Sequence, residues 1–216
     1  MSLFILTKEI LFPSPELADD DGLLAIGGDL SSERLLLAYR QGIFPWFNEQ
    51  EPILWWYPNP RFVLFPNELK ISRSMRTICN NGSFRFTINQ SFEAVMNNCQ
   101  DVPRKGEPGT WLSKDLIQAY TGLHLQGYAH SAETWVGDEL VGGLYGIILG
   151  KVFFGESMFS KVSNASKFAF INYVQHLQNQ GIELIDCQVY SPHLESFGAR
   201  MISKTEFAKL LTELIN

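Results

Sequence analysis

Cysteine is scarce in this chain of 216 residues, which has only Cys79, Cys99 and Cys187. These residues lie far apart, form no CxxC motif and have no nearby histidine pair, so the sequence predicts neither structural zinc nor disulfides. The pattern is typical of the reducing cytoplasm, where we expect this protein to act. The four histidines lack ligand spacing, and no GxSxG or Cys/His arrangement occurs. Metal and acyl-enzyme mechanisms are therefore disfavoured, and we expect no cofactor.

Long hydrophobic runs are also absent. The apolar stretches, such as 147–149, are far shorter than the roughly 20 residues of a membrane helix. The N-terminal MSLFILTKEI lacks a basic start and a small-residue cleavage site, so we expect no export signal. With 45% hydrophobic and 19% charged residues, the composition predicts a folded soluble globule, either one large domain or a domain with a smaller lobe.

Positive charge is in the minority, with 17 Lys and Arg against 23 Asp and Glu. A net charge of -6 argues against a nucleic-acid partner. The segment 61–114 nevertheless has eight basic and four acidic residues, most densely in KISRSMRTICNNGSFR. Lys70, Arg73 and Arg76 recur every three residues and would lie close to one face of a helix. A solvated helix surface and a basic binding patch both remain open.

The first sixty residues are rich in Pro, Gly and Trp. Within them SSERLLLAYRQG predicts a helix, capped by Ser31 or Ser32 and ended near Gly42, with loops and turns around it. The segment YPNP, residues 57–60, marks a lobe boundary. We therefore predict a small N-terminal domain over 1–60 and a larger domain over 61–216.

The larger domain alternates between strand and helix patterns. FRFTI predicts a strand, SFEAVMNNC and WLSKDLIQAYTGLHLQG predict helices, and residues 130–159 predict a three-stranded antiparallel meander punctuated by two Gly turns. A helix over ASKFAFINYVQHLQNQ, a strand over IELIDCQVY and a last helix follow. This order indicates an α+β fold, a sheet with helices packed on it.

Two carboxylates occur in apolar strands. In IDCQV, side-chain alternation places Asp186 and Gln188 on one face and turns Cys187 to the other. Glu156 follows the aromatic residues of VFFGESMFS, at the end of the third meander strand. A charge in such a strand is costly unless it is paired or hydrogen-bonded. The two acids indicate either a cleft that handles a cation or a proton, or two structural ion pairs.

Aromatic and apolar residues suggest two kinds of contact. The helical stripe that includes Phe170 and Tyr173 is either core or, if it faces Phe153 and Met158, the wall of a pocket for an apolar side chain. Trp46 and Trp111 lie in segments rich in Gly and Pro, where they either pack between lobes or offer a flat face to a base.

Ten ordered blocks carry a resemblance to a known family: GLLAIGGDLS, GIFPWF, ILWWYPNPR, ISRSMR, GTW, HSAETW, LVGGLYG, FFGESMFS, NASK and LIDCQV. In order and spacing they resemble the bacterial leucyl/phenylalanyl-tRNA-protein transferases, from about Phe12 to the C-terminus. The resemblance implies a small N-terminal domain joined to an acyl-CoA N-acyltransferase-like domain. It also implies a cytoplasmic aminoacyltransferase of the N-degron pathway, which moves Leu or Phe, and less readily Met, from aminoacyl-tRNA to an N-terminal Arg or Lys.

The resemblance also implies roles for particular residues. Two tryptophans would hold the terminal adenosine of the tRNA, five residues would form the pocket for the transferred side chain, three would lie at the transfer centre, and three would meet tRNA phosphates. In that order these are Trp46 and Trp111; Leu144, Phe153, Met158, Phe170 and Tyr173; Glu156, Asp186 and Gln188; and Lys70, Arg73 and Arg76.

An aminoacyl ester is already activated, so the reaction needs alignment and a neutral amine more than a strong base. We predict that Gln188 orients the attacking amine, while Asp186 either polarises Gln188 or receives the acceptor's cationic side chain. The main alternative is an acetyl-CoA-dependent N-acetyltransferase, although MFSKVSNASK lacks the glycines of its phosphate-binding loop. A non-catalytic RNA-binding module would not need the two acids and Gln188 together. We expect a monomer, because no long unmatched apolar face appears.

Overall fold

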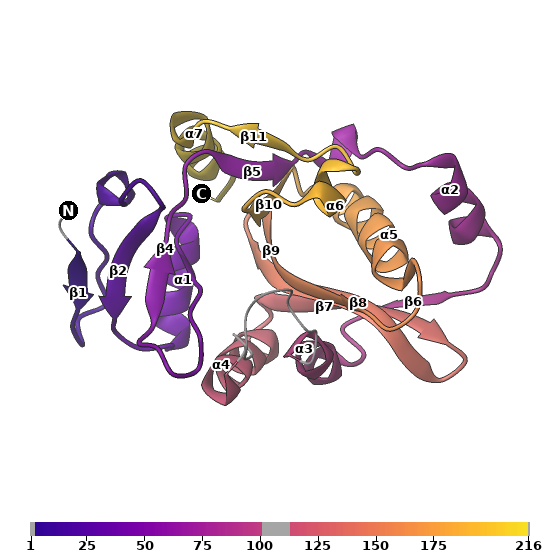
Figure 1. Cartoon of the computed structure of the whole chain (residues 1–216), viewed down its shortest axis with the longest axis horizontal. Helices are drawn as coiled ribbons and strands as arrows, with labels where there is room; N and C mark the ends of the chain where they lie inside the picture. The colour runs from indigo at the N-terminus through magenta and orange to yellow at the C-terminus, as the bar shows by residue number, and fades with distance from the viewer. Residues whose placement is uncertain (1–2, 101–112, 216) are drawn as a thin grey trace.

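The structure, a computed structural model, describes residues 3–100 and 113–215. In these residues the chain forms two sheets, seen side by side in Figure 1. The smaller sheet has the order β1-β2-β4-β3, with β1 at Phe4–Leu6, β2 at Leu23–Gly27, β3 at Phe44–Pro45 and β4 at Leu54–Trp56. The sequence predicted loops and turns here. Strands of two to five residues are too short to show a clear period of two, so this sheet was missed.

The larger sheet has seven strands in the order β11-β5-β10-β9-β8-β7-β6. Their bounds are β5 Arg61–Leu64, β6 Arg85–Ile88, β7 Ala129–Val136, β8 Glu139–Leu149, β9 Val152–Ser160, β10 Leu184–Gln188 and β11 Arg200–Ile202. Neighbouring strands are antiparallel except β9 and β10, which are parallel. The predicted meander, β7 to β9, is confirmed, as is the α+β class with a mixed sheet.

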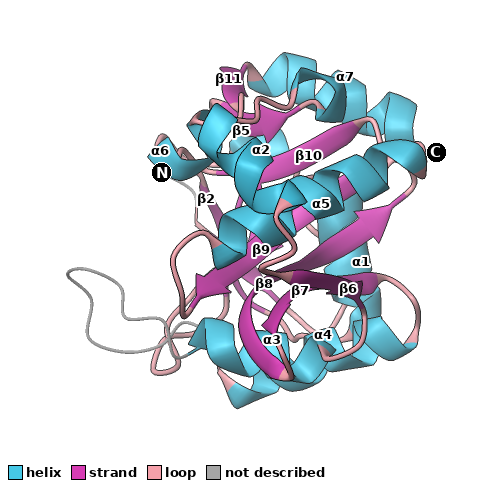
Figure 2. Ribbon diagram, turned by 90° about the vertical axis from the view of Figure 1, so that its right-hand side faces the viewer, coloured by secondary structure: helices cyan, strands magenta, loops and turns pink. Residues whose placement is uncertain are grey.

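Helices cover both faces of the larger sheet (Figures 1 and 2). α5 packs on β7 and β8 from one side, and α3 and α4 pack on the same strands from the other. The helices are α1 Ser32–Arg40, α2 Arg73–Asn80, α3 Phe92–Gln100, α4 Lys114–Leu125, α5 Ala165–Asn179, α6 Pro192–Glu195 and α7 Lys204–Ile215, with short 3-10 turns at Pro15–Leu17 and Pro66–Glu68.

Helix α1 follows its sequence signals. The Ser31 hydroxyl accepts a hydrogen bond from the Arg34 backbone N–H at 3.4 Å, which confirms the predicted cap. Just beyond the helix, Gly42 adopts a φ of +74°, and a Cβ atom there would lie 2.7 Å from the Phe207 ring. Gly42 therefore both ends the helix and lets α7 approach it closely.

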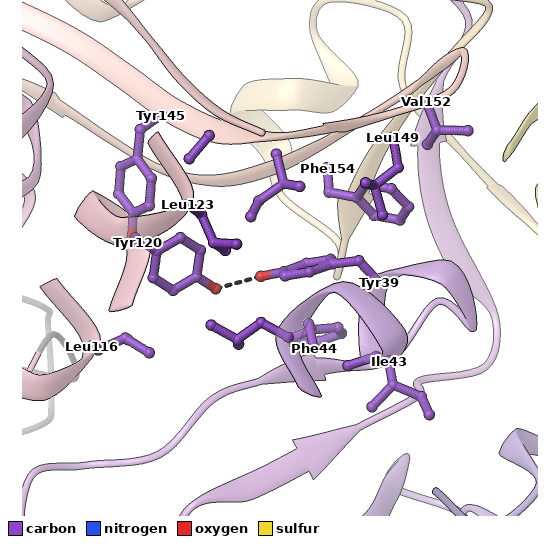
Figure 3. Close-up of a cluster of buried hydrophobic side chains, with 14 of the residues drawn as sticks. Tyr39, Ile43, Phe44, Leu116, Tyr120, Leu123, Tyr145, Leu149, Val152 and Phe154 are labelled. Carbon is purple, nitrogen blue, oxygen red and sulfur yellow. Dashed lines mark hydrogen bonds between the residues drawn. The ribbon is translucent and has the colours of Figure 1, made fainter. Parts of the chain in front are cut away.

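The main hydrophobic core is shared between the two sheets. Tyr39 of α1 and Trp55 of β4 belong to the same buried cluster as Tyr120 of α4, Phe154 of β9 and Phe207 of α7. Figure 3 shows the part of this cluster around Tyr39 and Tyr120. The proposed division near residue 60 stays a prediction. Among the described residues, no helix is long and apolar enough to cross a membrane.

Candidate functional site

A cavity of about 560 Å³ opens where strands β9 and β10 separate. Their parallel pairing ends at Phe154 and Asp186, whereas β9 continues to pair with β8. The residues that line the cavity come from β3, β8, β9, β10, α5 and the segments next to β3 and α6. They are Phe44, Pro45, Trp46, Leu144, Tyr145, Phe153, Gly155, Glu156, Ser157, Met158, Phe159, Ser160, Ser166, Phe170, Ile185, Cys187, Gln188, Val189, Ser191, His193 and Leu194. The cavity is therefore walled mainly by apolar side chains.

Four of the five residues expected to hold the transferred side chain line this cavity, namely Leu144, Phe153, Met158 and Phe170. Tyr173 does not line it but packs edge-on against Phe153, with ring centroids 5.2 Å apart. The Phe153 ring lies across Gly146 of β8, where an added Cβ atom would come within 2.5 Å of it. Gly146 thus lets the ring cross its neighbouring strand.

Trp46 lies on the same cavity and keeps 36% of its surface exposed. The Trp56 indole N–H donates to the Trp46 carbonyl oxygen at 2.7 Å, and the two rings are 5.8 Å apart. The backbone of Trp46 is thereby fixed while part of its ring faces solvent. The second tryptophan of the prediction, Trp111, lies outside the described residues.

Glu156 faces polar side chains from three other elements. Tyr39 of α1 and Gln188 of β10 donate to its Oε1, each at 2.8 Å, and the Tyr120 hydroxyl of α4 lies 3.1 Å from its Oε2. The two tyrosine hydroxyls are also hydrogen-bonded to each other (Figure 3). Burial raises the pKa of Glu156 to about 7, although these hydrogen bonds oppose the rise. Glu156 can therefore gain or lose a proton near neutral pH.

The side-chain alternation predicted for β10 fails at its end. A bulge falls between Asp186 and Gln188, and Gln188 has a φ of +64°. The amide of Gln188 consequently turns to Glu156, while Cys187, which was predicted to face away, lines the cavity. Burial raises the pKa of the Cys187 thiol far above its usual range, so it does not supply a thiolate nucleophile.

Asp186 pairs with a residue that sequence reasoning did not single out. Arg61 of β5 donates to both of its carboxylate oxygens, at 2.8 and 2.6 Å, and both side chains are almost fully buried. Oδ1 also accepts the backbone N–H of Gln188 at 2.9 Å. The carboxylate thus holds the bulge in place, and the side-chain amide of Gln188 is engaged with Glu156 instead.

The Arg61 guanidinium joins three parts of the chain. It lies 5.0, 5.8 and 4.6 Å from the ring centroids of Phe44, Tyr57 and Phe207, and it donates to the Gly42 carbonyl oxygen at 2.8 Å. Residues of the small sheet region and of α7 therefore surround the cation that fixes β10.

Tyr39 and Tyr120 were also missed as members of the site. One weak signal was available for Tyr39, because it follows Leu35 by four residues and so shares the apolar face of α1. For Arg61, the signal was a cation at the start of the apolar run RFVL. Neither pattern identifies the partner, which lies more than a hundred residues away in both cases.

The three basic residues predicted to meet tRNA are all exposed. Arg73 and Arg76 lie on α2, but the helix begins at Arg73, so Lys70 precedes it and the expectation of one helical face was wrong. The Lys70 backbone N–H donates to the Phe197 carbonyl oxygen at 2.8 Å. None of the three forms a salt bridge with a described residue, so their charges are available to a partner.

The structure thus places an apolar cavity beside a hydrogen-bonded pair of a carboxyl group and an amide, Glu156 and Gln188. Comparison with known proteins gives the family. The model of the leucyl/phenylalanyl-tRNA protein transferases matches residues 63–212, and the model of their N-terminal domain matches 28–59. The chain belongs to the leucyl/phenylalanyl-tRNA-protein transferase family, and it is a tRNA-dependent aminoacyltransferase.

Relatives cover nearly the whole chain. A leucyl/phenylalanyl-tRNA-protein transferase of Flavobacterium johnsoniae is 57% identical over 97% of this chain and 99% of its own. One from Syntrophobacter fumaroxidans is 54% identical over 100% and 92%. Among solved structures, L-PGS from Bacillus licheniformis has a TM-score of 0.46 at 15% identity over 88% of this chain and 72% of its own. A GCN5-related N-acetyltransferase-like protein from Streptococcus suis has 0.40 at 9% over 78% and 63%.

Proposed function

We propose that this protein moves Leu or Phe, and less readily Met, from aminoacyl-tRNA to the N-terminal Arg or Lys of acceptor proteins. It acts in the cytoplasm as a monomer and marks its products for degradation by the N-degron pathway. The observation that carries this proposal is an apolar cavity that ends at the hydrogen-bonded pair of Gln188 and Glu156. Such a cavity accepts Leu, Phe and Met side chains by shape and discriminates among them modestly.

Gln188 is the residue that orients the amine. Its Nε2 group donates to Glu156, so its carbonyl oxygen Oε1 is the acceptor offered to an amine N–H in the cavity. The neutral amine attacks the carbonyl carbon of the ester, and the π electrons of the C=O bond move to the carbonyl oxygen. Collapse of this intermediate re-forms the carbonyl and breaks the bond to the ribose oxygen. That oxygen leaves with a proton, while the nitrogen gives one up.

Asp186 acts in this proposal as a positioning residue. Its carboxylate is engaged by Arg61 and by the Gln188 backbone, so it neither polarises the Gln188 side chain directly nor awaits the acceptor's cation. It holds Gln188 in the left-handed conformation that points the amide at Glu156. A displaced Gln188 would misalign the amine, and a misplacement of about 1 Å can cost about 100-fold in rate.

The tRNA is held at two places. The exposed part of the Trp46 ring stacks on the terminal adenosine beside the cavity, with Trp111 as the second platform. Lys70, Arg73 and Arg76 meet backbone phosphates, so tRNA binding weakens as salt rises. A plot of log K for tRNA binding against log salt has a negative slope. Replacing any one of these cations with Gln should reduce the magnitude of this slope by about 1. Lys151→Gln, at an exposed cation paired with Glu183, is the matched control.

The proposal is tested with radiolabelled Leu-tRNA and two peptides that differ only in their first residue, Arg or Ala. We expect label on the Arg peptide alone. Equal labelling of both, or labelling of neither, would contradict the proposed activity. Replacing the Leu-tRNA with labelled acetyl-CoA tests the N-acetyltransferase alternative in the same assay, and tRNA binding without any transfer would favour a binding module.

Two variants separate the site from the fold. Gln188→Ala should bind Leu-tRNA normally but transfer its Leu group much more slowly, since the acceptor for the amine is removed together with the hydrogen bond to Glu156. Leu125→Ala changes a residue that is 83% exposed at the end of α4 and should leave transfer unchanged. Full turnover by Gln188→Ala at saturating substrates would remove Gln188 from the mechanism.

A further inference from the structure

The oxygen atoms of Tyr39, Tyr120 and Glu156 form a closed triangle of contacts. One contact joins the two hydroxyls, a second joins Tyr39 to Oε1 at 2.8 Å, and a third joins Tyr120 to Oε2 at 3.1 Å. Each hydrogen bond needs one proton, and each tyrosine hydroxyl supplies only one. If Glu156 is ionised, two protons must serve three contacts, so one pair of oxygens faces each other without a proton.

A protonated Glu156 supplies the missing donor. With the proton on Oε2, the carboxyl donates to Tyr120, Tyr120 donates to Tyr39, and Tyr39 donates to Oε1. Oε1 is then the carbonyl oxygen, and it also accepts the Gln188 Nε2 group at 2.8 Å. Every donor and acceptor in the group is satisfied in this arrangement, which matters because both tyrosines are fully buried.

We propose that Tyr39, Tyr120 and protonated Glu156 form a ring of three hydrogen bonds, and that the two tyrosines are positioning residues that set when Glu156 ionises. This inference rests on the proposed function only in its consequence for transfer. Ionised Glu156 pulls more strongly on the Gln188 N–H, which makes the Gln188 carbonyl oxygen a better acceptor for the amine. The ring then determines the pH at which the transfer centre becomes active.

Among the described residues that face Glu156, no cation balances its charge. The nearest charge on the neighbouring strand is the carboxylate of Asp186, which disfavours ionisation of Glu156 and is itself paired with Arg61. The titratable and charged groups around Glu156 are Tyr39 on α1, Tyr120 on α4, Asp186 and Cys187 on β10, Arg61 on β5, and Tyr145 on β8 and His193 on α6 across the cavity. The burial that raises the pKa of Glu156 to about 7 agrees with the proton count.

Infrared spectroscopy tests the ring without any turnover. The carbonyl band of a protonated carboxylic acid is recorded for the intact protein from about pH 5 to pH 9, a range that lies above ordinary carboxyl pKa values. The band belonging to Glu156 is the one lost in Glu156→Gln. We expect it to be present at low pH and to titrate near neutrality. In Tyr39→Phe and Tyr120→Phe its midpoint should fall by about 1 pH unit, because each variant removes the contact that ionisation leaves without a proton.

A matched control and a kinetic measurement complete the test. Tyr128→Phe, at a half-buried tyrosine outside the cavity, should leave the midpoint unchanged. The acidic limb of the single-turnover transfer rate should move to lower pH together with the infrared midpoint in each variant. An absent Glu156 band at low pH, or a midpoint that neither phenylalanine variant lowers, would overturn the ring. A normal titration in a protein that transfers no Leu from Leu-tRNA would contradict only the proposed function.

Discussion

Glu156 and Asp186 stand on neighbouring parallel strands, at the point where these strands part, yet their surroundings are opposite. Asp186 meets a guanidinium and a backbone N–H. Glu156 meets two hydroxyls and an amide, all neutral. A buried carboxylate with a cation is fixed as one half of an ion pair, whereas one with neutral donors can exchange its proton near neutral pH. Asp186 therefore holds its neighbours in place, whereas Glu156 can change its protonation state.

Breaking the ion pair is expected to have the largest effect on stability. Asp186→Asn leaves the Arg61 guanidinium buried without its countercharge, which should lower the free energy of unfolding by about 3 to 5 kcal/mol. Urea unfolding monitored by fluorescence measures the change. Glu156→Gln is the counterpart on the other strand and should cost much less, because it leaves no cation behind. Equal losses in the two variants would remove the distinction between the acids.

Replacing the whole ion pair should separate stability from activity. The double variant Arg61→Met, Asp186→Leu removes both charges, and apolar replacements of buried pairs are often neutral for stability. We expect its unfolding midpoint to recover most of the loss seen in Asp186→Asn. Transfer should remain about 100-fold slower than in the unchanged protein, since the Gln188 backbone has lost its acceptor. Recovery of both properties would show that Asp186 has no positioning role.

The proton on Glu156 should appear in the pH dependence of folding. The pKa of this side chain rises from 4.5 to about 7 on folding, mainly through burial. Between these values the folded state keeps a proton that the unfolded chain has released, so the free energy of unfolding falls as the pH rises through this window. Between about pH 5 and pH 8, the free energy of unfolding should therefore fall less in Glu156→Gln than in the unchanged protein. Parallel curves for the two proteins would argue against a raised pKa.

The smallest effect concerns an ion pair at the surface. Lys151 and Glu183 approach to 2.6 Å, the same distance as the Nη2 contact between Arg61 and Asp186, but both are more than half exposed. Glu183→Gln should change the free energy of unfolding by less than about 1 kcal/mol, and added salt should reduce even this difference. A loss as large as that of Asp186→Asn would mean that distance, rather than burial, decides what such pairs contribute.

The elements with strong local signals could be predicted from the sequence. The Ser31 cap and the apolar spacing of α1, the Gly turns of the meander, and the long helix α5 all involve residues within a few positions of each other. The family resemblance implied that Glu156 and Gln188 lie close together, and the two side chains are hydrogen-bonded to each other. The short strands of the small sheet were not recognised, since their pairing partners rather than their own patterns define them.

The contacts that give each acid its character could not be predicted in the same way. Tyr39 and Glu156 are separated by 117 positions, and Arg61 and Asp186 by 125, so no local period connects them. Alternation along β10 placed Gln188 on the wrong face, because the bulge reverses the side chain that follows it. A bulge depends on the strands on both sides, and the five letters IDCQV contain no sign of it.

The enclosure of Arg61 has a consequence for dividing the protein. Gly42, Phe44 and Tyr57 surround its guanidinium, and all three precede the predicted boundary near residue 60. A fragment that begins at residue 61 would present this arginine to water and would also leave Glu156 without Tyr39. The first sixty residues thus supply direct contacts to Arg61 and Glu156, so the surroundings of both acids depend on both halves of the chain.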